Sequence, residues 1–228
     1  MGWRDAEDGR RELVFRVKDP ISALTHFLGL LAALAGGFPL LIRAALHGRD
    51  LADLLSLAAF VGGLILLYGA SSAYHTFTLS PAGIKRLKKL DHAMIYLLIA
   101  GSYAPVCRLG IGGETGTRLL AVVSLLALAG CAVTLFWVDC PKWVSSLLYI
   151  GLGWACVFAL PQIMSRLAGI PLALLAGGGI LYTVGGVIYA LHIPLPCARP
   201  GFGNHEVFHL FVLAGSLCHY LMIFFYLA

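Results

Sequence analysis

The sequence predicts an all-α, polytopic membrane protein that folds as a seven-helix transmembrane bundle. Of its 228 residues, 60% are hydrophobic and only 12% are charged, and the mean hydropathy of +0.88 lies far above that of soluble domains. Seven apolar stretches are long enough to cross the hydrocarbon of a bilayer, which takes roughly 20 helical residues. These stretches are residues 21–46, 51–77, 90–109, 117–138, 144–164, 170–193 and 207–228. We therefore predict a single transmembrane domain over residues 21–228.

The first 20 residues differ from the rest of the chain in composition. They include ten charged side chains and lack the short apolar stretch of a signal peptide. We therefore expect residues 1–20 to form a short cytoplasmic polar tail. The breaks between the apolar stretches are short and rich in turn-forming residues, so they leave no room for a soluble domain.

The distribution of Lys and Arg predicts the orientation of the bundle, because these residues accumulate on the cytoplasmic side. With the N-terminus inside, eleven of the 16 lie in inside segments and five in outside segments. We therefore predict a multi-pass protein of the inner membrane, with a cytoplasmic N-terminus and the C-terminus outside. This orientation explains the net charge of +5 without a nucleic-acid partner.

Small and kinking residues inside the apolar stretches predict how the helices pack. Glycines occur side by side at 36–37, 62–63, 177–179 and 185–186. Hinges are one interpretation, but close approach of helices in lipid requires small residues in any case, and we favour packing. Pro105, Pro161 and Pro171 predict kinks or helix starts.

Histidines inside the apolar stretches point to function, because ionisable side chains in membrane helices are costly. Residues 205–209 read HEVFH, which places His205 and His209 four residues apart on one helix face. His75, near the same predicted end of the second stretch, is the best-placed third ligand. Three imidazoles with an open fourth position are typical of catalytic zinc. We therefore predict a Zn²⁺ site near the cytoplasmic face.

Two further polar residues are expected at the same depth. Asp91 begins the third apolar stretch, and Ser71 lies one helical turn before His75 on the same face. Asp91 is a candidate general base, and Ser71 a candidate hydrogen-bond donor to water or to a developing oxyanion. Any one of the histidines alone is equally well explained as a solvated interfacial side chain. Their shared depth is what favours a site.

The other histidines receive separate interpretations. His219 lies ten residues after His209, too deep for the site, and we expect it to form a hydrogen bond between helices. Indirect support of the site and purely interfacial roles stay equally open for His26, His92 and His192.

Three separated segments resemble one protein family. They read SSAYH at 71–75, KKLDHAMIYLLIAGSYAP at 88–105 and FGNHEVFHLFVLAGSLCH at 202–219. Together they resemble the hemolysin III proteins, bacterial members of the progestin and adipoQ receptor (PAQR) superfamily, over nearly the whole chain. The resemblance implies a seven-helix fold with one zinc held near the inner leaflet by His75, His205 and His209. It also places the family's serine at Ser71 and its aspartate at Asp91.

The chain departs from this family at one motif. Relatives usually show E-x-x-N-x-x-T-H in the first helix, whereas residues 19–26 read DPISALTH, with Asp19 for the acid and Ser22 for the amide. The eukaryotic branches of the superfamily resemble ceramidases in fold and zinc site, and they accept Gln between the two histidines of the seventh helix. This implies that Glu206 is not the base of an H-E-x-x-H protease. We expect Glu206 to point away from His205, toward cytoplasmic water.

Three functions are compatible with these features. The leading hypothesis is a zinc-dependent hydrolase of a lipid amide or ester, with membrane lipids as its partners, Asp91 as base and Ser71 at the oxyanion. The first alternative is a non-enzymatic membrane-homeostasis or sensor protein with structural zinc, which a closed shell of four protein ligands would favour. The second alternative is a cytolysin, although the sequence shows no continuous polar stripe to line a pore. Intramembrane proteolysis is disfavoured because no third ligand follows the seventh stretch.

Overall fold

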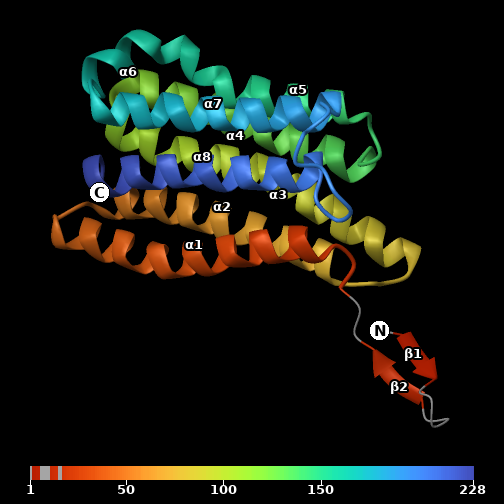
Figure 1. Cartoon of the computed structure of the whole chain (residues 1–228). Helices are drawn as coiled ribbons and strands as arrows, with labels where there is room; N and C mark the ends of the chain where they lie inside the picture. The colour runs from red at the N-terminus through yellow and green to blue at the C-terminus, as the bar shows by residue number, and fades with distance from the viewer. Residues whose placement is uncertain (1, 6–10, 15–16) are drawn as a thin grey trace.

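The computed structural model describes residues 2–5, 11–14 and 17–228, and in these it contains seven long apolar helical spans packed side by side (Figure 1). The spans are Pro20–Leu46, Leu51–Thr76, Pro81–Ile111, Gly113–Phe136, Lys142–Arg166, Ile170–Leu191 and Asn204–Tyr226. The predicted all-α, seven-span fold class is therefore confirmed. The first span begins at the opposite end of the bundle from the C-terminus (Figure 1). Which end faces the cytoplasm stays a prediction.

Two of the spans are interrupted, and a proline lies next to each interruption. The helical segments are α1 (Pro20–Leu46), α2 (Leu51–Thr76), α3 (Pro81–Pro105), η1 (Val106–Ile111), α4 (Gly113–Phe136), α5 (Lys142–Gly153), η2 (Trp154–Ala159), α6 (Leu160–Arg166), α7 (Ile170–Leu191) and α8 (Asn204–Tyr226). α3 passes at Pro105 into the π-helical η1, and the 3₁₀ segment η2 separates α5 from α6. Pro161 and Pro171 lie in the first turns of α6 and α7. The predicted helix starts at Pro161 and Pro171 are confirmed, and the helix changes type after Pro105, as expected of a residue without an N–H donor.

A two-stranded hairpin precedes the bundle. Strand β1 (Gly2–Asp5) pairs antiparallel with β2 (Arg11–Val14), and Figure 1 shows the pair beyond the end of the bundle at which α1 begins. The sequence predicts only a polar tail here, because hydropathy does not detect so short a pairing. Residues 1, 6–10 and 15–16 of that predicted tail lie outside the described residues.

The third span begins earlier than hydropathy predicts. α3 starts at Pro81, nine residues before the apolar stretch, with Ser80 as its N-cap. The added turns are polar, and Lys85 and Lys88 each lie 2.8 Å from a carboxylate oxygen of Asp139 in the α4–α5 loop. The hydrogen bonds from Lys85 and Lys88 lower the pKa of Asp139 to about 2. Hydropathy counts apolar length, so it misses this polar extension.

Glycines let α2 and α3 approach closely, as the sequence predicts. A Cβ on Gly101 of α3 would lie 2.6 Å from the carbonyl oxygen of Ala59, and one on Gly63 of α2 would lie 3.1 Å from Leu98 Cα. Neither neighbour is a flexible side-chain end, so the backbones themselves are in contact. A Cβ on the adjacent Gly62 would meet nothing within 4 Å. Only one glycine of the 62–63 pair therefore serves packing.

The distribution of apolar side chains is that of a protein in lipid. Leu57 and Phe60 are completely buried in the bundle core, whereas Phe136 and Phe158 are about nine-tenths exposed on its outside (90% and 89%). Water would make such exposure costly, but a bilayer solvates these side chains. Hydropathy and burial agree that this is a multi-pass membrane protein.

Candidate metal centre

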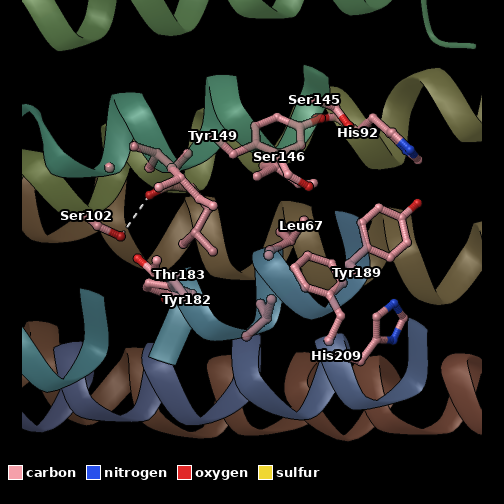
Figure 2. Close-up of a pocket in the computed structure, with 18 of the residues that line it drawn as sticks. Leu67, His92, Ser102, Ser145, Ser146, Tyr149, Tyr182, Thr183, Tyr189 and His209 are labelled. Carbon is pink, nitrogen blue, oxygen red and sulfur yellow. Dashed lines mark hydrogen bonds between the residues drawn. The ribbon is translucent and has the colours of Figure 1, made fainter. Parts of the chain in front are cut away.

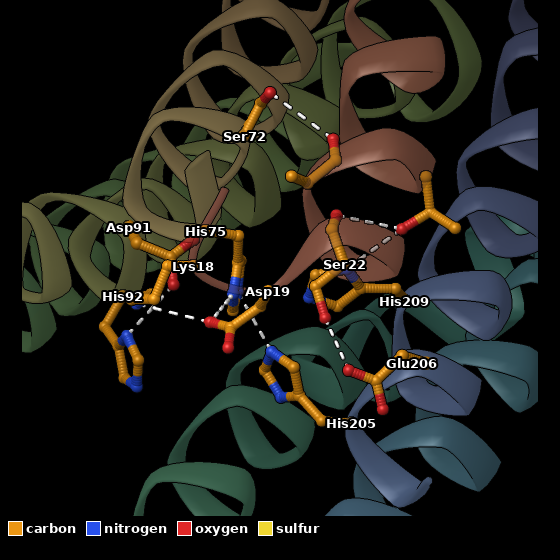
Figure 3. Close-up of polar contacts among 12 residues, drawn as sticks. Lys18, Asp19, Ser22, Ser72, His75, Asp91, His92, His205, Glu206 and His209 are labelled. Carbon is orange, nitrogen blue, oxygen red and sulfur yellow. Dashed lines mark hydrogen bonds and ion pairs between the residues drawn. The ribbon is translucent and has the colours of Figure 1, made fainter. Parts of the chain in front are cut away.

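Two helices bring three histidines together at one end of the bundle, here called the histidine end (Figure 3). His75 lies in the last turn of α2, and His205 and His209 lie in the first two turns of α8. Each histidine offers one ring nitrogen, and these three nitrogens all lie within 4.8 Å of one another. The Nε2 atoms of His75 and His205 are 3.0 Å apart. His75 and His209 are buried, and His205 is half-buried. The structure therefore gathers the three predicted ligands into one cluster.

This cluster fits a divalent cation in its chemistry and spacing. Nitrogens of a tetrahedral zinc site lie about 2.05 Å from the metal, and hence about 3.3 Å from one another. The separations in the cluster bracket that value. Two imidazole lone pairs at 3.0 Å repel unless a proton or a cation lies between them. Among the described residues no fourth His, Cys, Asp or Glu belongs to the group. The cluster can therefore hold a metal ion with three protein ligands.

Asp19 orients the first of these histidines. Its Oδ2 lies 2.9 Å from His75 Nδ1, and its backbone N–H donates to the carbonyl of His75 at 2.9 Å. A carboxylate on one ring nitrogen is the usual partner of a histidine that binds metal through the other. Burial acts to raise the pKa of Asp19, but the hydrogen bond from His75 and the charge of Lys18 outweigh it and lower the pKa.

Glu206 has a different environment from the one that the sequence predicts. Its carboxylate accepts hydrogen bonds from the Gly203 backbone N–H at 2.8 Å and from the Ser22 hydroxyl at 2.6 Å. The sequence predicts a side chain that faces water; in the structure Glu206 is half-buried, and one donor from α1 and one from the start of α8 bind its carboxylate. The group of possible metal ligands comprises the three histidines and does not include Glu206.

Thr25 and His26 of α1 contact the third histidine. Thr25 Oγ1 lies 3.3 Å from His209 Nδ1, and the His26 ring stacks on the His209 ring with centroids 3.5 Å apart and an interplanar angle of 8°. His26 is only 3% exposed, and neither of its ring nitrogens has a hydrogen-bond partner among the described residues. His26 is therefore buried against the cluster and is not a solvated interfacial side chain.

Ser71 and Asp91 share a cavity with two of the cluster histidines. Both are buried and line the cavity that His205 and His209 also line. The Ser71 hydroxyl has no hydrogen-bond partner among the described residues. Asp91 Oδ2 lies 3.3 Å from His92 Nδ1, and both residues are shown in Figure 3. The site therefore contains one orphaned hydroxyl and one buried carboxylate.

The cavity extends from the histidine cluster toward the middle of the bundle. It has a volume of about 150 Å³, with His209 and Tyr189 at one end and Ser102, Tyr182 and Thr183 at the other (Figure 2). Its walls are mainly apolar. His219 reaches its deep part, and His219 Nε2 lies 3.3 Å from the Leu175 carbonyl of α7, which confirms the predicted hydrogen bond between helices.

The sequence singled out the motif at residues 19–26, but it did not predict what the polar side chains of this motif contact. Asp19, Ser22 and Thr25 recur every three residues, so they share one face of the helix start. That spacing was visible in the sequence. Their partners are up to 184 residues away, however, and no local pattern identifies them.

A bundle of seven apolar helices, with a three-histidine cluster and a cavity at one end, defines a polytopic membrane protein with a candidate metal centre. The model of the haemolysin-III related family matches residues 15–220. The chain belongs to this family, which supports placement in the bacterial inner membrane.

Named relatives agree with this assignment. The chain is 35% identical over 211 residues to "Hemolysin-3" of Bacillus cereus, covering 92% of both chains. It is 34% identical over 215 residues to "Hemolysin-3 homolog" of Bacillus subtilis, covering 93% of this chain and 96% of the relative. More distantly, it is 28% identical over 226 residues to the "Adiponectin receptor protein" of Drosophila melanogaster, covering 91% of this chain and 50% of the relative.

Proposed function

We propose that this protein binds zinc through His75, His205 and His209 and hydrolyses an amide or ester bond of a membrane lipid. The observation that carries the proposal is the donor set, which is three imidazoles beside a cavity that Ser71 and Asp91 also line. Structural zinc sites usually have four protein ligands, whereas catalytic sites keep one position open. Three ligands therefore favour a hydrolase over a structural zinc staple.

The chain supplies a base for the reaction. A zinc ion held by the three histidines would supply Lewis acidity, lowering the pKa of a water toward about 7 and polarising a carbonyl. In the proposed reaction, Asp91 takes a proton as the water oxygen bonds to the carbonyl carbon. It returns that proton to the amine or alcohol when the C–N or C–O bond breaks. His92 Nδ1 lies within ion-pair distance of this carboxylate, 3.3 Å from Asp91 Oδ2.

Ser71 is the candidate donor to the developing oxyanion. Its hydroxyl is buried, lines the cavity and has no hydrogen-bond partner among the described residues. A buried donor without a partner costs free energy unless a ligand satisfies it. Removal of one oxyanion donor typically lowers kcat by about 10²–10³-fold.

The walls of the cavity fit the acyl chain of a lipid. Side chains from several helices make them apolar, namely Leu67, Ile95, Leu98, Ile99, Ile150, Phe208 and Val212. Apolar walls bind hydrocarbon and exclude bulk water from the reacting bond. A chain that follows the cavity from its deep end brings the first polar bond of a lipid toward the histidines.

The test combines metal content with lipid turnover in the purified protein. Wild type is expected to contain close to one zinc per chain and to release fatty acid from a lipid amide or ester in micelles. His209→Ala should lose most of the zinc. His219→Ala removes a histidine of the same helix that lies outside the cluster, and it should keep the zinc. Asp91→Asn should keep the zinc and lose about 10²–10⁴-fold in turnover.

The alternatives make different predictions in the same experiment. A structural zinc would leave His209→Ala short of zinc, while wild type would hydrolyse none of a panel of lipid amides and esters. A cytolysin would release dye from liposomes that contain the purified wild type, and Asp91→Asn would release as much. An equal zinc content per chain in wild type and in His209→Ala would overturn the assignment of His209 as a zinc ligand.

A further inference from the structure

The start of α1 gives the cluster no ligand, yet polar side chains there contact two of its histidines and the neighbour of the third. Asp19 contacts His75, Thr25 contacts His209, and Ser22 contacts Glu206, the neighbour of His205. We propose that Asp19, Ser22 and Thr25 are positioning residues that fix the tautomer and direction of the metal-binding imidazoles. This inference rests on metal binding in the proposed function and not on hydrolysis.

The hydroxyl of Thr25 determines which nitrogen of His209 carries the proton. A hydroxyl has one hydrogen, and Thr25 donates it to the Ser22 carbonyl at 3.0 Å. Toward His209 Nδ1, 3.3 Å away, Thr25 Oγ1 can then act only as an acceptor. His209 Nδ1 is therefore the protonated nitrogen, and its Nε2 lone pair is left for a cation.

Asp19 acts on His75 in the same way. A carboxylate is an acceptor only, so His75 Nδ1, 2.9 Å from Asp19 Oδ2, must carry a proton. The lone pair of a neutral His75 is then on Nε2, the atom that lies 3.0 Å from His205 Nε2. The backbone bond from Asp19 to the His75 carbonyl keeps this end of α2 against α1.

Ser22 fixes the start of α8. Its hydroxyl bonds to Glu206 Oε1, while Glu206 Oε2 accepts from the Gly203 backbone N–H. The first turn of α8 is thereby held on α1, and His205 lies in that turn. One helix face thus aligns ligands that come from two other helices.

The first experiment measures zinc affinity by competition with a chelator in purified full-length protein. Asp19→Ala and Thr25→Val each leave an Nδ1–H without its acceptor, and each should weaken zinc binding about 10–100-fold. Thr25→Ser restores a hydroxyl and should bind within about threefold of wild type. Ser72→Ala is the matched control, because Ser72 also bonds to α1, through the Ala23 carbonyl, without contacting a ligand histidine.

The second experiment separates positioning from simple support of the fold. In protein labelled with ¹⁵N-histidine, the imidazole shifts of His75 and His209 should report Nδ1–H with unprotonated Nε2 in the metal-free wild type. Thr25→Val should give a mixture of tautomers at His209. The Tm of the metal-free variant should stay within about 2 °C of wild type. If Thr25 only supported the fold, the substitution would instead lower Tm and leave the tautomer of His209 unchanged.

Zinc affinity within about threefold of wild type in both Asp19→Ala and Thr25→Val would overturn the inference, as would Nε2–H at both histidines. A wild type that binds zinc but hydrolyses no lipid leaves the inference intact and removes only the hydrolase. A wild type that binds no divalent metal overturns both.

Discussion

Gly101→Ala is expected to destabilise the bundle where α2 and α3 cross. The new Cβ would lie 2.6 Å from the carbonyl oxygen of Ala59 and 3.2 Å from its carbonyl carbon. Both atoms belong to helix backbone and cannot rotate away. The two helices must separate by roughly 0.8 Å to restore an ordinary contact of 3.4 Å.

The size of the effect follows from the van der Waals attraction that this separation weakens along the crossing. A gap of 0.5–1 Å removes about a quarter to a half of the attraction of each atom pair, which is about 0.1–0.2 kcal/mol at its optimum. If the crossing loses as much contact as one buried leucine makes, about 40 atom pairs, the attraction falls by about 2 kcal/mol. This agrees with the cost of about 1–3 kcal/mol for overpacking a core. Gly62→Ala is the control, because its Cβ meets nothing within 4 Å.

The free energy of unfolding in mixed micelles, titrated with a denaturing detergent, measures both variants. Gly101→Ala should lie about 2 kcal/mol below wild type, and Gly62→Ala should equal it or gain up to about 1 kcal/mol from helix propensity. α2 carries Ser71 and α3 carries Asp91, so the same separation should also lower lipid turnover. If Gly101→Ala is as stable as Gly62→Ala, the inference that the backbones of α2 and α3 touch at Gly101 is refuted.

Three further outcomes are expected. Glu206→Gln keeps an acceptor oxygen and should retain turnover within about tenfold, whereas Asp91→Asn should lose about 10²–10⁴-fold; equal losses would restore a base role for Glu206. A chelator should lower the Tm of wild type, because zinc at about 100 times its Kd adds about 2.7 kcal/mol, and His209→Ala should not respond. Hydrogen bonds from Lys85, which has the larger effect, and from Lys88 hold the pKa of Asp139 at about 2 in the folded protein, below the ordinary 3.8. Its stabilisation is therefore complete above about pH 4 and lost as pH falls toward 2, so Tm scans across that window should fall more steeply for wild type than for Asp139→Asn.

The sequence alone determined the properties that depend on local composition. The length of each apolar stretch predicted seven spans, because the thickness of the hydrocarbon sets how many helical residues are needed. The i, i+4 spacing of His205 and His209 predicted that one helix contributes two histidines. Hydropathy also indicated the depth of each polar residue, which was sufficient to select His75, Ser71 and Asp91.

Only the tertiary structure decided which helices are neighbours and how each is turned about its axis. Depth did not reveal that the first helix contacts all the cluster histidines or their neighbours, since Thr25 and His209 are 184 residues apart. It did not predict that Glu206 accepts a hydrogen bond from Ser22. Nor did it separate Gly63, which lies against α3, from Gly62, which meets nothing. The physical reason is that transfer into lipid fixes a position along the membrane normal, whereas lateral packing fixes rotation, and packing involves side chains far apart in the chain.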